Sequence, residues 1–395
     1  MSYYPTRQLC NVGVTLLDCE HRTPKASPVG YPYVAIPNIK KGRLDLSEVR
    51  LISKEDFESW TKKTKPQAGD IIVTRRARVG DTAVVPLGLD CAIGQNLVIL
   101  RSDGSKLDQS YLRWALQGPI YEEQVRKFMN VGAVFDRLNC ADIPKFEIPV
   151  PPLPEQRAIA RILGSLDNKI ELNHRQNKTL EAMAEAIFRQ WFIEEADDGW
   201  EETTIENVCV RIASGGTPST KVGEYYNGDI NWYSTRELSD TFLYESSTKI
   251  TNSGLENSSA KMFPENTVLI AICAAPTVGR LGILANDATF NQSACGFIAD
   301  ENKICFEYLY LHLLFSRQKL NNIASGSAQQ NLNVKIIKNF EILLPPSNIV
   351  QKLKCVVRPI FQQIKLNTKQ IMTLEKLRDT LLPKLMSGDV RVDYS

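Results

Sequence analysis

A proline-rich hinge followed by a long helix-forming stretch occurs twice in this sequence, and it constrains the fold more than any other feature. The hinge Pro149–Pro154 follows Phe-Glu-Ile at 146–148, and the same triplet at 340–342 precedes Pro345-Pro346, a spacing of 194 residues. From Glu155 to Ala196 the only Gly or Pro is Gly164. The prolines of each hinge prevent helix formation there, and few helix-breaking residues follow. We therefore expect a duplicated chain with two long helices.

The two helical stretches share an apolar seam whose steps alternate between four and three residues, the a/d pattern of a coiled coil. The first seam comprises Ile159, Leu163, Leu166, Ile170, Asn173, Asn177, Leu180, Ala184, Ile187 and Trp191. Adding 194 gives the second, which comprises Leu353, Val357, Ile360, Ile364, Asn367, Ile371, Leu374, Arg378, Leu381 and Leu385. A long helix with one apolar stripe must bury it, and the simplest partner is the other copy. The alternative is that each helix packs on its own globular domain. Asn173 and Asn367 occupy equivalent positions, where a buried Asn sets helix-pair register.

The duplication predicts an α+β protein with four segments and pseudo-two-fold symmetry. Two mixed α/β domains, 1–150 and 197–346, are separated by two long antiparallel coiled-coil helices, in 151–196 and 347–395. In the first domain we expect strands at 33–36, 70–73 and 96–100 and one helix over about 108–129. The second domain repeats this plan, since Val278-Gly279 matches Val79-Gly80 and Gln292 matches Gln95. We expect Pro359 and Pro383 to kink the second helix or mark its true ends.

Composition and missing motifs exclude several classes of protein. There is no phosphate-binding loop, no Asn/Asp-Pro-Pro-Tyr/Phe methyltransferase motif and no glycine-rich cofactor fingerprint. The three His lie in separate segments, and the nine Cys lack metal or disulfide spacing, so we expect no metal, no catalytic residue and reduced thiols in the cytoplasm. We also expect no signal peptide and no membrane span. Residues 1–150 carry 21 basic and 17 acidic residues, against 11 and 17 in residues 197–346, so nucleic-acid binding must depend on local patches.

The loop from Thr74 to Gly80 is the most suggestive candidate for such a patch. Arg75, Arg76 and Arg78 lie within four residues after an apolar strand. Arginine forks suit phosphates and guanine edges. A solvated turn with one or two carboxylate pairs explains the loop equally well. In the second domain the matching stretch is Cys273–Thr277, so the scaffold is retained while the loop chemistry changes.

The sequence resembles the specificity subunit of type I restriction-modification systems. The residues that carry the resemblance are PVPPLPEQRAIARIL (149–163) and its weaker echo LLPPSNIVQKL (343–353), SGGTPST (214–220), SGSAQQNLN (325–333) and LLPKLMSGDV (381–390). It covers essentially the whole chain. In the first domain, residues 130–135 depart from the Ser-Gly-Ser-Ala type of loop, and the second hinge is weaker.

The resemblance implies a non-catalytic subunit that recognises a bipartite sequence in double-stranded DNA, one half per domain. It implies docking of two methyltransferase subunits, which hold S-adenosylmethionine while this chain binds no cofactor, and two nuclease-translocase subunits can join them. For DNA contacts we select Lys40, Lys41, Arg75, Arg76 and Arg78 in the first domain, and Ser219, Thr235, Arg236 and Gln329 in the second. From Pro154 to Ala196 the helix would span roughly 65 Å, against ~34 Å per turn of DNA. The alternative from another class is a coiled-coil scaffold for protein assembly; a self-contained enzyme is disfavoured by the missing motifs.

Overall fold

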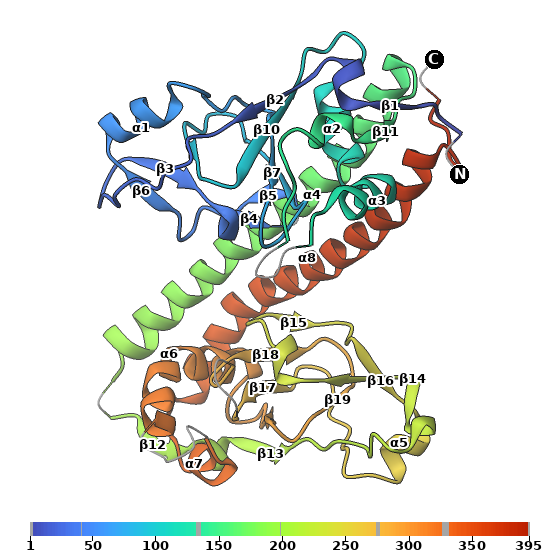
Figure 1. Ribbon diagram of the computed structural model, residues 1–395. Helices are drawn as coiled ribbons and strands as arrows, with labels where there is room; N and C mark the ends of the chain where they lie inside the picture. Colours follow the sequence, from blue (N-terminus) through green and yellow to red (C-terminus); the bar gives the residue numbers. More distant parts are fainter. Residues whose placement is uncertain are drawn as a thin grey trace. The chain divides into compact units, whose positions relative to one another are not determined.

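A computed structural model describes residues 3–40, 42–131, 136–197, 199–273, 277–325 and 332–393. The chain forms two compact units (Figure 1). Unit 1 comprises Met1–Lys169 and Leu374–Ser395, and unit 2 comprises Ile170–Thr373. Each unit therefore contains one globular domain together with a part of both long helices, α4 (Leu153–Arg189) and α8 (Ser347–Ser387).

Unit 1 is built on a four-stranded sheet in the order β2-β10-β7-β8. All three pairs of neighbouring strands in this sheet are antiparallel. A second sheet has the order β6-β3-β9, and two short pairs are β1-β11 and β4-β5. The strands are β1 (Thr6–Gln8), β2 (Val14–Asp18), β3 (Tyr31–Val34), β4 (Ile39–Lys40), β5 (Arg43–Leu44), β6 (Arg50–Ile52), β7 (Ile71–Thr74), β8 (Thr82–Val84), β9 (Ala92–Ile93), β10 (Leu97–Ser102) and β11 (Glu147–Pro149), and the helices are α1 (Lys54–Thr61), α2 (Gln109–Ala115) and α3 (Pro119–Phe128).

Unit 2 repeats this arrangement. Its sheets have the orders β13-β20-β17-β18-β15, β16-β14-β19 and β12-β21, so β13, β20, β17 and β18 correspond to β2, β10, β7 and β8. The strands are β12 (Glu201–Thr204), β13 (Cys209–Ser214), β14 (Tyr226–Tyr233), β15 (Phe242–Leu243), β16 (Thr248–Ile250), β17 (Val268–Ala271), β18 (Leu281–Leu284), β19 (Thr289–Phe290), β20 (Ala294–Ala299) and β21 (Glu341–Leu344), and the helices are α5 (Asn252–Glu256), α6 (Phe306–Ser325) and α7 (Val334–Lys338).

The turns after β7 and β17 show how closely the backbones of the two domains agree. Gly80 donates its backbone N–H to the carbonyl of Thr74, and Gly279 donates to that of Ala271, both over 2.9 Å. Both glycines have positive φ, +86° and +82°, which side chains disfavour. This explains why Val-Gly occurs at the same place in both halves, and the mixed α/β duplication expected from the sequence is present.

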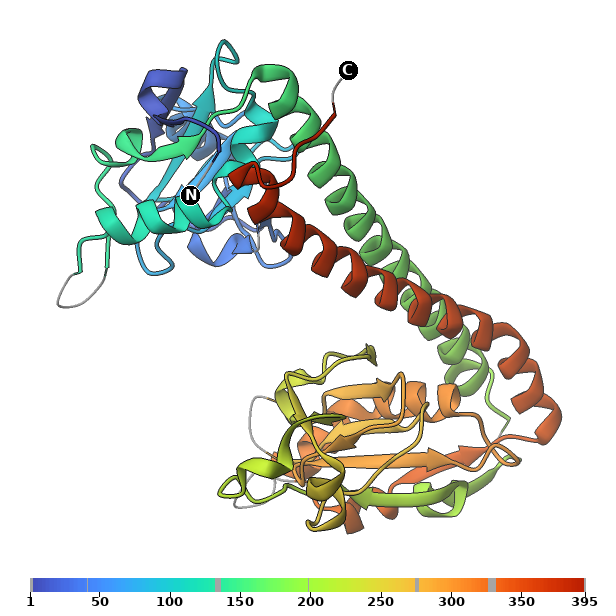
Figure 2. The same cartoon turned by 90° about the vertical axis from the view of Figure 1, so that its right-hand side faces the viewer.

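The long helices contact each other and both domains (Figure 2). In unit 1, Ile159 and Leu163 of α4 share one core with Leu385 and Met386 of α8. In unit 2, the core contains Ala184 and Phe188 of α4 together with seam residues of the first half of α8. Every position of the two seams is buried or half-buried. Packing on a helix and packing on a domain are therefore not alternatives here, because each helix does both.

Two expected helix boundaries were wrong, and one of the two alternatives for Pro359 is excluded. The stretch from 108 to 129 forms two helices, α2 and α3, because Pro119 starts a new helix after Leu116–Gly118. The first long helix ends at Arg189 and continues only as a π-helical turn, Gln190–Glu194, so it does not reach Ala196 as an α-helix. Pro359 does not begin the second helix, since α8 runs through it. Burial of Val357 and Phe361 on either side offsets the cost of the missing backbone hydrogen bond.

Candidate nucleic-acid interface

In unit 1, three loops meet where β7 ends and β10 begins. Arg75 donates its backbone N–H to the carbonyl of Asn96 over 2.8 Å, and Leu138 donates to the carbonyl of Arg75 over 2.9 Å. The loop after β7, the turn before β10 and the segment after α3 are thus tied together. Asn130 and Arg137 close the base of the last segment with a mutual pair of backbone hydrogen bonds; residues 132–135 lie outside the described residues.

Unit 2 has the same junction at the end of β17. Ile272 donates to the carbonyl of Ser293 over 2.8 Å, and Leu332 donates to that of Ile272 over 2.9 Å. Ile272 corresponds to Arg75 and Ser293 to Asn96, each 197 residues further along the chain. Leu332 corresponds to Leu138, 194 residues further along. The backbone junction is therefore duplicated, whereas the side chains on it differ. We call the two sites the loop junctions of unit 1 and unit 2.

The selected residues of unit 1 divide into exposed and structural ones. Arg76 is exposed, and it faces the strand-like segment of Arg137 across an isolated bridge. Lys40 on β4 is also exposed, but its ammonium lies 2.5 Å from Asp45 Oδ2. Arg75 is half-buried. Arg78 donates to the backbone carbonyls of Ile36 and Ile39, so it ties the loop after β7 to the turn before β4. Lys41 lies outside the described residues.

In unit 2 the selected residues differ in exposure. Ser219 and Arg236 are exposed, but Thr235 is only 6% exposed. Ser234 and Glu237 cap the short 3-10 helix Thr235–Glu237, in which Thr235 is the buried residue. Gln329 lies outside the described residues. Sequence spacing alone could not reveal the direction of a side chain in a single helical turn.

The seam asparagines are buried between α4 and α8 in unit 2. Asn173 donates to Gln370 Oε1 over 2.8 Å, and Asn367 donates to Asn177 Oδ1 over 2.9 Å. Asn177 in turn donates to Thr368 Oγ1 over 3.2 Å. Asn173 and Asn367 are therefore bonded across the helix pair, each to a residue other than its sequence counterpart. The partner numbers decrease in α8 as they increase in α4, so these helix segments are antiparallel.

A buried aspartate of unit 1 was missed in the sequence. Asp167 on α4 is 3% exposed and pairs with Arg43 of β5 at 2.7 Å, with Arg113 of α2 and with Arg378 of α8 at 3.2 Å. Burial alone would raise the pKa of Asp167, but the charges of Arg113 and Arg43 outweigh it and hold the pKa below its ordinary value. The position of Asp167 in the sequence, directly after the seam residue Leu166, could have indicated a buried charge. Arg43 thus serves the fold.

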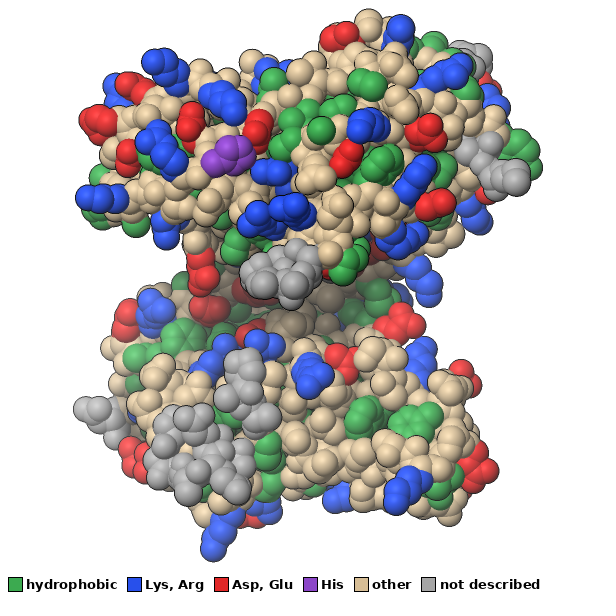
Figure 3. Space-filling view, viewed as in Figure 1, with side chains coloured by type: hydrophobic (Ala, Val, Ile, Leu, Met, Phe, Trp, Pro, Cys, Tyr) green, Lys and Arg blue, Asp and Glu red, His purple; other side chains and the backbone are tan. Residues whose placement is uncertain are grey.

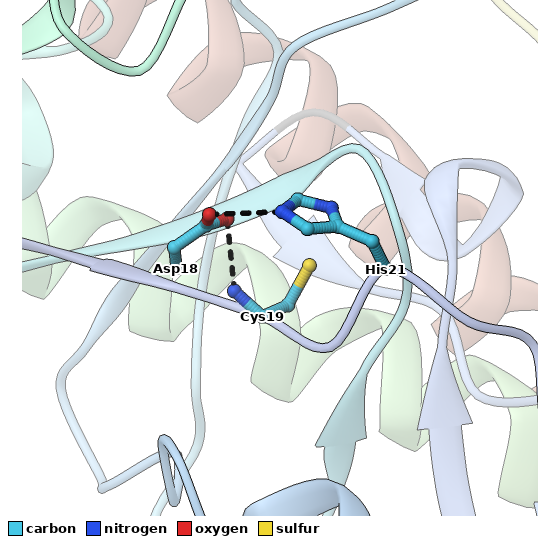
Figure 4. Close-up of side chains that lie close together, drawn as sticks. All are labelled: Asp18, Cys19 and His21. Atoms are coloured by element: carbon cyan, nitrogen blue, oxygen red, sulfur yellow. Dashed lines mark hydrogen bonds and ion pairs between the residues drawn. The ribbon is translucent and has the colours of Figure 1, made fainter.

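One group of described residues has three potential metal ligands close together, Asp18, Cys19 and His21 (Figure 4). Their donor atoms lie within 4.8 Å of one another, and His21 Nε2 is 3.0 Å from Asp18 Oδ2. Burial, with the charge of Asp18 adding to it, raises the pKa of the Cys19 thiol to about 11. Lys63 Nζ also lies 3.8 Å from Asp18 Oδ2. A protonated thiol and a competing ammonium fit a hydrogen-bonded turn better than a cation site.

Charge is distributed without a single continuous basic patch on the face in Figure 3. Basic side chains alternate there with acidic and uncharged ones in both units. Arg76, Arg137 and Arg236 are among the exposed basic side chains of the two units. Among the described residues, no helix is both long and apolar enough to cross a membrane.

The two domains carry divergent side chains on one retained loop junction, the arrangement of a duplicated two-domain chain. The family model described as type I restriction modification DNA specificity domain matches residues 17–182 and 197–376. This chain belongs to that family, as its hinge and loop residues indicated.

Known relatives include type I specificity subunits, and one solved structure shares the fold. The chain is 27% identical over 351 residues to the type I restriction enzyme MjaIX specificity subunit of Methanocaldococcus jannaschii, covering 82% of this chain and 78% of the relative. It is 23% identical over 335 residues to the HindI specificity subunit of Haemophilus influenzae, covering 66% and 72%. The crystal structure of a type I restriction-modification S subunit from M. genitalium matches with a TM-score of 0.66 at 17% identity, covering 98% of this chain and 96% of that one.

Proposed function

We propose that this chain is the non-catalytic DNA-recognition subunit of a type I restriction-modification complex, and that each unit recognises one half of a bipartite target in double-stranded DNA. The observation that carries the proposal is the duplicated loop junction. The backbone bonds of Arg75 and Leu138 recur at Ile272 and Leu332. The arginine-rich stretch 75–78 is replaced by Cys273–Thr277. A retained frame with changed side chains suits two related domains that bind different sequences.

The paired helices are proposed to fix the spacer between the half-sites and to dock two methyltransferase subunits. The helix α4 has 37 residues, a length of roughly 55 Å at ~1.5 Å per residue. This exceeds one turn of B-DNA, ~34 Å. The buried hydrogen bonds of Asn173 and Asn367 would keep the two helices in one register. The methyltransferase partners would supply S-adenosylmethionine and the adenine-modifying chemistry, and nuclease-translocase subunits would complete the restriction enzyme.

Domain exchange in the assembled complex tests this proposal. The chain would be purified with its methyltransferase partners, and its methylated sites mapped by sequencing of the modified DNA. Replacing residues 1–150 by the corresponding domain of a relative is expected to change one half of the target and leave the other half and the spacer length unchanged. A change in both halves, or in neither, contradicts the assignment of one half-site to each unit.

A second candidate function is a helical scaffold whose domains bind proteins, and the excess of acidic over basic residues in 197–346 favours it. Phosphate contacts release counterions, so DNA recognition predicts a steep fall of affinity with salt. Titration of the complex with duplex DNA at several salt concentrations distinguishes the two functions. Salt-insensitive or undetectable binding supports the scaffold.

A further inference from the structure

The two loop junctions share a threonine–glutamine pair that the proposed DNA contacts did not include. In unit 1, Gln95 donates from its Nε2 to Thr23 Oγ1 over 3.2 Å. In unit 2, the Thr217 hydroxyl donates to Gln292 Oε1. Both threonines precede a proline, and the pairs correspond at displacements of 194 and 197 residues. Both glutamines are exposed, although most side chains of the surrounding strands are buried.

Equivalent hydrogen bonds hold each threonine in place. The carbonyl before Thr23, that of Arg22, accepts from the hydroxyl of Tyr33 and the indole of Trp60, each over 3.2 Å. The carbonyl before Thr217, that of Gly216, accepts from the indole of Trp232 over 2.9 Å. Tyr33 and Trp232 lie at matching positions on β3 and β14, one residue before Val34 and Tyr233.

The prolines that follow are held in the same manner. The carbonyl of Pro24 accepts from Arg50 over 3.1 Å, and that of Pro218 accepts from the hydroxyl of Tyr226 over 2.6 Å. The bonding positions are retained although the residues that supply the donors have changed. Different side chains therefore hold the backbone on both sides of the threonine in each unit.

Each glutamine is presented by a fixed turn. Gly94 donates to the carbonyl of Val34 over 2.7 Å, and Asn291 donates to that of Tyr233 over 2.9 Å. These residues directly precede Gln95 and Gln292. The next residue in unit 1, Asn96, receives the hydrogen bond from Arg75, so the turn belongs to the loop junction. Each glutamine thus directly precedes the residue whose carbonyl accepts the junction hydrogen bond, Asn96 in unit 1 and Ser293 in unit 2.

The threonine leaves most of the amide's hydrogen-bonding capacity available. A glutamine amide has two N–H donors and two acceptor lone pairs, and a hydroxyl uses one of these four positions. One donor and one acceptor therefore remain for a bidentate contact, the pattern that the N7 and N6 of adenine match in the major groove. A side chain already held by a neighbour also binds with a smaller loss of conformational freedom.

We propose that Gln95 and Gln292 are corresponding base-contacting residues, each reading a base pair of its own half-site with an adenine edge, and that Thr23 and Thr217 are their positioning residues. This inference rests on the proposed function, since it assigns specificity to named side chains of the same interface.

The test uses the complete complex with its methyltransferase partners. Gln95→Ala and Gln292→Ala are compared with Gln67→Ala and Gln318→Ala, which change exposed glutamines of the same units that are not among the hydrogen-bonded residues of the loop junctions. Affinity for the wild-type target and for single-base variants of every target position is measured at two salt concentrations. A lost bidentate contact corresponds to a fall in affinity of roughly 5- to 150-fold.

Each glutamine substitution is expected to relax preference at one A·T position of one half-site, while the control variants leave all positions unchanged. Thr23→Val and Thr217→Val are expected to weaken preference at the same position by a smaller factor, with unchanged melting temperature. If the glutamine variants keep full base preference, or weaken all sequences equally with a reduced salt slope, the inference is overturned. A wild-type complex with no preferred sequence would instead refute the proposed function.

Discussion

Asn367 on α8 donates a hydrogen bond from Nδ2 to Oδ1 of Asn177 on α4 over 2.9 Å, in a polar stretch of the helix interface that also holds the Asn173–Gln370 and Asn177–Thr368 hydrogen bonds. The two side chains are 4% and 8% exposed. Buried amides must find partners on the facing helix, and only one axial alignment supplies them. The pair therefore sets register in this part of the molecule more strictly than leucines would.

Removing one member of this pair is predicted to destabilise the chain. Asn367→Ala leaves Asn177 with an unsatisfied buried acceptor, at a cost of roughly 1–3 kcal/mol. Replacing both asparagines by leucine is expected to recover much of that loss, because neither buried member of the amide pair then remains without the other. Denaturant unfolding of the single and double variants measures both effects, with the exposed Lys369→Ala as control. Additive losses in the double variant would contradict the pairing.

Loss of charge at Asp167 is predicted to weaken unit 1 severely. Asp167→Asn leaves three arginines around a buried neutral amide, and breaking a buried ion pair in this way costs about 3–5 kcal/mol. Asp90→Asn is the control, because Asp90 pairs with Lys65 at the surface, where both side chains are more than half exposed. Its cost is expected to be about 0–1 kcal/mol. Equal melting temperatures of the two variants would refute a structural role for Asp167.

The pH dependence of stability gives an independent check on Asp167. Its pKa is lowered on folding, so its contribution is fully present above the pKa of the unfolded chain, about 3.9. The contribution is lost as pH falls below that value and through the folded pKa. Unfolding free energies from pH 6 to pH 3 are therefore expected to fall less steeply in Asp167→Asn than in the wild type. Parallel curves would show that the carboxylate does not gain stability from its arginines.

Two neighbouring arginines are predicted to behave differently. Arg76→Ala is expected to weaken binding to all DNA sequences, to lower the salt slope by about one and to leave the melting temperature unchanged, because Arg76 is an exposed cation. Arg78→Ala removes bonds to the carbonyls of Ile36 and Ile39, so it is expected to lower stability by roughly 1 kcal/mol. DNA titration and thermal unfolding of both variants separate the two roles. An unchanged salt slope in Arg76→Ala would exclude a phosphate contact.

The turn that presents Thr217 is predicted to tolerate no side chain at Gly216. A Cβ there would lie 2.0 Å from the carbonyl oxygen of Ser259, a backbone atom that cannot move alone. Gly216→Ala is expected to cost roughly 1–3 kcal/mol or more. Gly223→Ala is the matched control, since a Cβ at Gly223 meets nothing within 4 Å. Thermal unfolding compares them, and similar values for the two would show that the turn can relax.

Repetition made much of the fold predictable from the sequence. The matched seams and the recurrence of Val-Gly predict two related α/β domains and two long helices, because each spacing is tested twice in one chain. The directions of individual side chains were less accessible. Arg78 is turned to the backbone of residues 36–39 and Thr235 to the interior, as folding brings distant segments beside them.

Ion pairs between distant segments were the other feature that local sequence patterns could not predict. Asp167 gains its partners from β5, α2 and α8, which are far apart in sequence. Pro359 does not mark the start of α8, because its local penalty is outweighed by apolar burial along the helix. The Thr23–Gln95 and Thr217–Gln292 pairs could have been found by asking which exposed polar residues recur in both halves.

The sharing of α8 between two cores has a consequence for biosynthesis. Leu385 and Met386 complete an apolar core whose other members come from residues 9 to 163, and Arg391 pairs with the buried Glu155. On a ribosome, the domain that emerges first must therefore wait for residues 374–393 before its interior closes. Residues 170–373 hold all of the other unit, so we expect that unit to complete its folding before the domain that is synthesised first.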